Sequence, residues 1–278
     1  MTRIHINSET LYFIGDIHGH FESINTFVKV HDIHNATLFF CGDCGFGFMS
    51  PEYYEKNIFP WLKKTLSRYN DYCIFVRGNH DDPHTFSSFA YNYKRIKVVP
   101  DYTVISVCRN NNKTSPCKNI LCIGGAISID RSRRIKKMKE SRSTNPCYWS
   151  GENCAFNAGA CDELKESGIS IDIVVSHSCP LFCDPPLTCT PDISSWITAE
   201  KFANLPELTG HDLMGDVRTE RTTLSALYDY LINNKSTLEC WFYGHYHFHN
   251  TMRVNSTTFC LLDMERNGIL DAHEYVLH

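Results

Sequence analysis

The chain of 278 residues has a formal net charge of −4, with 42% hydrophobic and 21% charged residues. This composition is that of an ordinary globular protein and excludes a disordered or low-complexity chain. The mildly acidic balance argues against bulk attraction to nucleic acid or to an anionic membrane surface.

The N-terminal segment and the apolar runs indicate the compartment. No run approaches the ~20 apolar residues of a membrane-spanning helix. Residues 1–3 lead almost directly into a strand, without the apolar core of a signal peptide. We therefore expect a cytoplasmic protein with no membrane partner.

Fourteen cysteines do not predict a disulfide framework in a chain of this length without a signal. Cys73, Cys122, Cys240 and Cys260 lie in apolar runs, where buried free thiols are common. A structural zinc at the cysteines between 147 and 189 is an alternative, although paired ligand knuckles are missing there.

The first half of the chain alternates strands with helices. Residues 11–14, 36–41 and 72–76 are short apolar runs typical of buried strands. Residues 21–30 and 53–69 between them have apolar positions at helical spacing. This order predicts parallel strands joined by right-handed crossovers, in which ligands bind beyond the carboxyl ends of the strands.

The second half continues with less regular elements. An Asn-rich loop at 110–113 is expected to be exposed, and residues 131–142 are the most basic stretch, either a solvated face or a phosphate-contacting rim. We expect one domain over residues 1–278, with insertions or long loops near 131–155 and 179–215. Whether 179–215 forms a lid is open. The expected elements are strands at 97–107, 119–129, 171–176, 240–243 and 257–262, and helices at 155–167 and 222–232.

Polar side chains suited to metal binding follow five of the predicted strands, and we expect them to lie at one edge. Mixed carboxylate, imidazole and amide ligands suit Mn, Fe, Zn or Ni better than Ca or Mg. They are too numerous for one tetrahedral ion and suit two ions about 3.5–4 Å apart that share a carboxylate. The residues are Asp16 and His18, Asp43, Asn79 and His80, His177, and His245 and His247.

These motifs, in this order, resemble the calcineurin-like metallophosphoesterases. They read Gly-Asp-Ile-His-Gly, Gly-Asp-Cys-Gly, Gly-Asn-His-Asp, Ser-His and Gly-His-Tyr-His, and they extend from Asp16 to His247. The resemblance implies an α/β fold, a four-layered α/β sandwich of two mixed β-sheets flanked by helices. It also implies two divalent metal ions as cofactors, with Mn favoured and Fe, Zn or Ni as alternatives.

The resemblance assigns a role to each motif residue. Asp16, His18 and His247 would hold one metal, and Asn79, His177 and His245 would hold the other. Asp43 would bridge both metals. His80 would be the general acid near the leaving group, oriented by Asp81.

The implied reaction is hydrolysis of a phosphate ester. Two cations neutralise the phosphate charge and lower the pKa of a bridging water, so that a hydroxide attacks while His80 protonates the leaving oxygen. The Ser/Thr protein phosphatase branch has Asp-Arg-Gly in its second motif, whose Arg binds phosphate, but residues 44–47 after Asp43 contain no Arg. We expect Arg131, Arg133 or Arg134 to supply the missing guanidinium.

Within this reading, we favour a phosphomonoesterase or phosphodiesterase acting on small or nucleotide-like substrates. The choice between the two is open, and a nucleic-acid end is also compatible with the basic stretch. The alternatives are a Ser/Thr protein phosphatase and a non-catalytic scaffold that binds a partner protein through the same fold.

Overall fold

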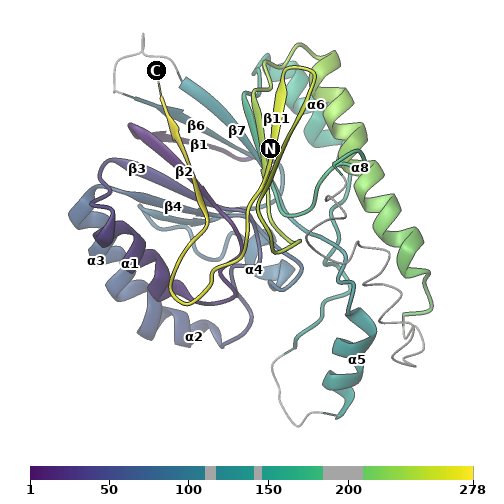
Figure 1. Ribbon diagram of the computed structural model, residues 1–278, viewed down its shortest axis with the longest axis horizontal. Helices are drawn as coiled ribbons and strands as arrows, with labels where there is room; N and C mark the ends of the chain where they lie inside the picture. The colour runs from purple at the N-terminus through teal and green to yellow at the C-terminus, as the bar shows by residue number, and fades with distance from the viewer. Residues whose placement is uncertain (110–116, 141–145, 184–208, 278) are drawn as a thin grey trace.

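The computed structural model describes residues 1–109, 117–140, 146–183 and 209–277. Two β-sheets pack against each other, and helices cover their outer faces (Figure 1). Each sheet contains parallel and antiparallel strand pairs. The fold is therefore the expected four-layered α/β sandwich of two mixed sheets.

The smaller sheet has the strand order β12-β2-β3-β4-β5. Strands β2 to β5 are parallel neighbours, and β12 pairs antiparallel with β2. The parallel strands place the loops after β2, β3 and β4 at the same edge. The strands are β2 (Thr10–Ile14), β3 (Ala36–Phe40), β4 (Tyr72–Phe75), β5 (Ile96–Val98) and β12 (Ala272–Val276).

The larger sheet has the strand order β1-β6-β7-β8-β9-β11-β10. Its central strands β7, β8, β9 and β11 are parallel, so their carboxyl ends also share an edge. The strands are β1 (Arg3–Asn7), β6 (Thr103–Cys108), β7 (Cys117–Ile123), β8 (Ile173–Ser176), β9 (Cys240–Tyr243), β10 (Asn250–Val254) and β11 (Thr257–Leu261).

Helices line the outer faces, except for α5, which projects away from the sheets (Figure 1). The helix expected at 53–69 begins as a π-helical turn, because Pro60 has no N–H to continue a regular ladder. The helices are α1 (Phe21–Val30), α2 (Pro51–Tyr53), the π-helix η1 (Tyr54–Ile58), α3 (Phe59–Tyr69), α4 (Pro83–Ser87), α5 (Arg131–Glu140), α6 (Ala158–Ser167) and α8 (Leu213–Asn233).

Three apolar cores separate the four layers. One lies between the smaller sheet and its helices, one between the larger sheet and its helices, and one between the sheets. In the middle core, the ring of Phe13 on β2 stacks on that of Phe242 on β9, with centroids 3.8 Å apart. This contact fixes the ends of β2 and β9 beside each other, and with them the loops that carry Asp16 and His245.

Several expectations about elements were wrong or incomplete. The strand expected at 97–107 is two strands, β5 and β6, in different sheets, because the chain turns at Pro100 and Asp101. Helix α8 begins at Leu213, earlier than expected, because the Asp212 side chain accepts the Gly215 N–H as an N-cap. Strands β10 and β12 were not predicted.

Two expected loops lie partly or wholly outside the described residues. The Asn-rich loop at 110–113 does so entirely, as does most of 179–215. Next to the first of these, Cys108 and Cys117 form a disulfide, which was not predicted. The β6–β7 register places the two cysteines directly opposite each other. The four cysteines expected as free thiols in apolar runs, Cys73, Cys122, Cys240 and Cys260, are free.

Candidate metal centre

The loops after β2 and β3 bring the first carboxylates together. The backbone N–H of His18 donates to the carbonyl of Asp43 at 2.8 Å, which ties the two loops to each other. Glycine is required where other loops approach these carboxylates. A Cβ on Gly78 would lie 2.1 Å from Asp43 Oδ1, and one on Gly244 would lie 2.1 Å from Asp16 Oδ1. The glycines before Asn79 and His245 therefore allow four strand-end loops to meet.

Asp16, His18, Asp43 and His247 form the first group of candidate ligands. Each offers a donor atom, and these atoms all lie within 4.8 Å of one another. His247 Nε2 lies 3.2 Å from Asp16 Oδ2 and 3.2 Å from His18 Nε2. In the described parts of the chain, this is the only set of three or more His, Cys, Asp or Glu side chains arranged in this way.

Asn79, His177 and His245 form a second group on the other side of Asp43. His177 Nδ1 contacts the Cys41 carbonyl at 2.7 Å, which directs Nε2 toward Asn79 Oδ1 at 2.9 Å and Asp43 Oδ1 at 3.2 Å. The ring of His245 packs against that of His177, with centroids 5.0 Å apart. The structure thus brings together all seven residues that the sequence proposed as ligands.

Asp43 lies between the two groups. Its Oδ1 accepts the backbone N–H of His80 at 2.8 Å. Its Oδ2 is buried without a hydrogen-bond partner, and it lies 3.9 Å from His18 Nε2 and 3.6 Å from His80 Nε2. A buried oxygen of an ionised carboxylate in this condition is costly unless a cation binds it. The residues present therefore fit a bridged pair of divalent cations.

The electrostatics of the centre also fit cation binding. Burial opposes ionisation of Asp43, but His177 and His80 hold its pKa well below the usual range. Burial lowers the pKa of His177, but Asp43 and Asp16 outweigh burial and raise it to about 10. Burial and the neighbouring His177 keep the pKa of His245 well below its ordinary value. The carboxylates thus attract positive charge. The proton on His177 supplies part of this charge, and bound metal ions would replace it.

His80 and Arg134 lie beside this cluster. The ring of His80 stands edge-on to that of His18, with centroids 4.9 Å apart, and its Nε2 contacts the guanidinium Nη2 of Arg134. The pKa of His80 is lowered to about 4, chiefly by burial and also by Arg134, although Asp43 opposes the shift. An imidazole and a guanidinium therefore stand together at the rim of the candidate centre.

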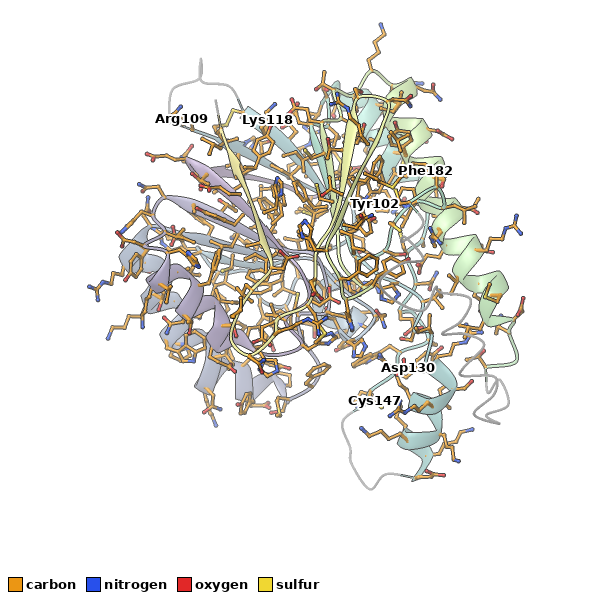
Figure 2. The ribbon with its side chains drawn as sticks, in the orientation of Figure 1. Tyr102, Arg109, Lys118, Asp130, Cys147 and Phe182 are labelled. Carbon is orange, nitrogen blue, oxygen red and sulfur yellow. A yellow bond between two sulfur atoms is a disulfide. The ribbon has the colours of Figure 1, made fainter. Side chains whose placement is uncertain are left out.

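Arg134 is held in place by the residue before its helix and by the segment that follows the helix. Its Nε donates to Asp130 Oδ1 at 2.6 Å, and its Nη1 donates to the Cys147 carbonyl at 3.4 Å. Figure 2 shows Asp130 and Cys147 near the end of α5 that faces the sheets. The guanidinium is thus oriented toward His80 by contacts on its other edges.

The other two candidate arginines lie elsewhere. Arg131 is buried and donates to Asp216 Oδ2 at 2.5 Å and to the His211 carbonyl at 3.1 Å, so it joins α5 to the start of α8. Arg133 is exposed on α5. Arg134, by contrast, contacts His80 at the rim of the candidate centre.

The geometry of Asp81 differs from its predicted role of orienting His80. Its buried carboxylate accepts four backbone N–H groups, from Gly78, Cys44, Gly45 and Phe46, at 2.7 to 3.1 Å. Among the described residues, no hydrogen bond joins it to the His80 ring. The physical reason is that the glycine turns expose unpaired N–H groups, which a buried carboxylate satisfies. Asp81 therefore fixes the loop after Asp43.

Sequence reasoning missed Ser128 and Glu152. Asn79 Nδ2 donates to Ser128 Oγ at 2.8 Å, and Ser128 Oγ donates to Glu152 Oε2 at 2.5 Å. The expected strand at 119–129 concealed Ser128, because β7 ends at Ile123 and Ser128 lies in a strand-end loop. No local pattern marks Glu152, which approaches from a separate segment. Burial raises the pKa of Glu152 to about 8, although Ser128 opposes the shift with two hydrogen bonds.

Comparisons with known proteins place this geometry in context. Within the described residues, no helix has both the length and the apolar character to span a membrane. A search of curated protein sequences found no match. Solved structures with a similar chain path include a dimetal phosphatase from Danio rerio, with 10% identity and a TM-score of 0.49 over 92% of this chain and 87% of that one.

Two further structures are similar over most of the chain. The protein GAP50 of Plasmodium, described as the anchor in the inner membrane complex, has 12% identity and a TM-score of 0.48 over 96% of this chain and 81% of that one. A protein serine/threonine phosphatase from Saccharomyces cerevisiae has 13% identity and a TM-score of 0.35 over 94% of this chain and 71% of that one. Likeness at this level says nothing about substrate.

The family model of the calcineurin-like phosphoesterases matches residues 10–248, which include every residue of the two ligand groups. That match covers far more than half of the sequence and agrees with the two-sheet fold and the ligand cluster. The chain therefore belongs to the calcineurin-like phosphoesterase family.

Proposed function

We propose that this chain hydrolyses phosphate esters at a centre of two divalent cations, with Mn as the favoured metal. Asp16, His18 and His247 would hold one cation, Asn79, His177 and His245 would hold the other, and Asp43 would be shared between them. The observation that carries the proposal is Asp43 Oδ2, which is buried without a hydrogen-bond partner between the two groups. The cytoplasmic location stays a prediction.

When bound, two divalent cations neutralise phosphate charge and supply a hydroxide nucleophile near neutral pH. The contribution of His80 is to hold a proton at Nε2 for the leaving oxygen. That atom lies 3.6 Å from Asp43 Oδ2, at the edge of the ligand cluster, and the side chain is 27% exposed. His80 is therefore accessible to both a substrate and the solvent that replenishes its proton.

Arg134 is the proposed phosphate ligand. Its guanidinium fork matches the geometry of phosphate oxygens, and Asp130 holds the Nε edge so that Nη2 points toward His80. A bound phosphate would replace His80 Nε2 as the partner of Nη2. This exchange also brings a phosphate anion beside His80, which raises its lowered pKa and favours the protonated imidazole that the leaving oxygen needs.

Small or nucleotide-like monoesters and diesters are the proposed substrates. A phosphoprotein is the second candidate, because Arg134 places a guanidinium beside His80 even though the Asp-Arg-Gly element is missing. A non-catalytic scaffold is the third candidate. It would bind metals without turning over any of these esters.

The test combines metal loading with three classes of substrate. The protein is stripped of metal, reloaded with Mn and assayed on nitrophenyl phosphate, bis-nitrophenyl phosphate and a phosphopeptide. We expect about two metals per chain and Mn-dependent hydrolysis, with the rate ratio of the first two substrates separating monoesterase from diesterase. Faster turnover of the phosphopeptide would favour the protein phosphatase, and two bound metals without any turnover would favour the scaffold.

A further inference from the structure

A buried series of hydrogen bonds leads from Asn79, a proposed ligand of the second metal, into the loop between β7 and α5 and on to the segment before α6. It runs from Asn79 through Ser128 to Glu152, and these three residues are 1%, 0% and 2% exposed. Ser128 lies between β7 and α5, and Glu152 precedes α6. Two loops outside the ligand motifs thus converge behind a single ligand side chain.

Each bond in this chain has a defined direction. The backbone N–H of Ser128 donates to Glu152 Oε1 at 2.8 Å, and its hydroxyl donates to Oε2 at 2.5 Å. A serine hydroxyl has one hydrogen, so the same oxygen can only accept from Asn79. Asn79 must therefore turn its amide nitrogen toward Ser128, at 2.8 Å.

The opposite end of the amide is fixed as a consequence. With Nδ2 on Ser128, the carbonyl Oδ1 faces His177 Nε2 at 2.9 Å, on the side of Asp43. Only the oxygen of an asparagine amide is a metal ligand, because the nitrogen has no free lone pair. Two bound cations would also favour the ionised, accepting form of Glu152.

We propose that Glu152, acting through Ser128, is a positioning residue that sets the amide of Asn79 with its oxygen toward the second metal. This inference rests on the proposed function, since it assigns a role toward a metal of that centre. Neither Ser128 nor Glu152 touches the metal position itself. Outer hydrogen-bond partners of metal ligands commonly change metal affinity by about 10–100-fold.

The isosteric variant Glu152→Gln tests the direction of the bonds without removing bulk. A glutamine that accepts from the Ser128 N–H presents its amide nitrogen to the Ser128 hydroxyl. The hydroxyl must then accept from glutamine and turn its hydrogen toward Asn79, which reverses the preferred orientation of that amide. Ser128→Ala removes the acceptor altogether and serves as the second variant if the first does not fold.

Equilibrium titration measures Mn binding by each variant, and electron paramagnetic resonance detects the metal pair. We expect Glu152→Gln and Ser128→Ala to bind the first Mn normally and the second about 10–100-fold more weakly. The matched control is Asp71→Asn, another buried carboxylate, which accepts the Ala36 N–H at the opposite end of the smaller sheet. It should leave both affinities unchanged.

A rescue separates orientation from general loss of structure. An aspartate at position 79 presents an oxygen whichever way it is turned, so Asn79→Asp in the Glu152→Gln background should restore the second Mn. Unchanged second-site affinity in both single variants, or no recovery in the double variant, overturns the positioning role while the proposed function stands. A wild-type protein that binds fewer than two Mn overturns both.

Discussion

The two halves of the candidate centre differ in how the surrounding protein holds them. In the half with His18 and His247, the side chains are 17% and 32% exposed, and their ring nitrogens contact each other and the carboxylate of Asp16. In the other half, Asn79 and His177 are 1% and 0% exposed. Each of these also has a partner outside the centre.

Those outside partners restrict the orientations of Asn79 and His177. The Cys41 carbonyl fixes one nitrogen of His177, and Ser128 fixes one end of Asn79. The protein therefore preorganises Asn79 and His177, whereas the imidazoles of His18 and His247 contact mainly Asp16 and each other and are more exposed.

The largest effect should come from Asp43→Asn, because Asp43 contacts both halves. Loss of its charge should weaken both metals together and reduce kcat/KM by more than the ~100-fold typical of outer-shell changes. Metal content and hydrolysis of nitrophenyl phosphate measure this. A variant that keeps two metals and more than a tenth of the activity would show that Asp43 is not shared.

His80→Asn should leave metal content unchanged and slow turnover by about 10²–10⁴, as expected for loss of a general acid. The loss should be smallest for nitrophenyl esters, whose leaving group needs no proton, and largest for alkyl esters. Rates on the two ester classes measure this. Equal slowing on both would contradict the acid role.

Arg134→Ala should lower kcat/KM by about 10- to 100-fold, since hydrogen bonds to charged groups contribute about 1.5–3 kcal/mol. Arg133→Ala is the matched control, because Arg133 is exposed on the same helix. Arg134→Lys should recover part of the loss through its charge. Identical kinetics for the two alanine variants would remove Arg134 from the substrate site.

Chelation should release the two metals in order. A chelator of moderate strength should first remove the ion held by Asp16, His18 and His247, because the side chains of His18 and His247 are partly exposed. In His247→Ala the fast phase should be missing, while one slowly released metal remains. Stopped-flow release with a metal-sensitive dye would measure both phases, and loss of only the slow phase in His247→Ala would reverse the comparison.

The smallest effect is expected from a change to Asp71, a carboxylate outside both halves of the centre. Asp71 Oδ2, like Asp43 Oδ2, is buried without a hydrogen-bond partner, but burial raises the pKa of Asp71 to about 7. The folded group thus keeps its proton above the unfolded pKa near 4. Its contribution to stability is therefore present at low pH and lost as pH rises from about 4 to about 7.

Asp71→Asn should remove that part of the pH dependence and leave metal binding intact. Urea unfolding at pH 5 and pH 8 measures it. Wild type should lose about 1–2 kcal/mol more than the variant between these values. The same loss in both proteins would mean that Asp71 stays ionised in the folded state.

Local patterns were sufficient to predict which residues the fold brings together in the candidate centre. Each ligand follows an apolar strand within a few residues, and parallel pairing brings such ends together at one edge. The glycines at 78 and 244 belong to the same motifs, and they permit the close approach of the loops. Short motifs that are contiguous in the sequence thus predicted both which residues belong to the candidate centre and that they lie close together.

The rim and the supporting contacts could not be predicted in this way. Arg131 and Arg134 lie in one basic run, but their partners are distant in the sequence. Arg131 bonds to Asp216, 85 residues away, and Arg134 contacts His80, 54 residues away. Strand β12 pairs with β2 across the whole chain length. Such pairings depend on the packing of the finished fold, and no spacing in the sequence encodes them.

The most direct test of the shared centre is electron paramagnetic resonance of the protein loaded with Mn, with metal content measured on the same sample. Two Mn bridged by Asp43 should give about two metals per chain and an exchange-coupled signal, which Asp43→Asn should abolish. A single uncoupled Mn signal in the wild-type protein, at one metal per chain, would contradict a dinuclear centre at these seven residues.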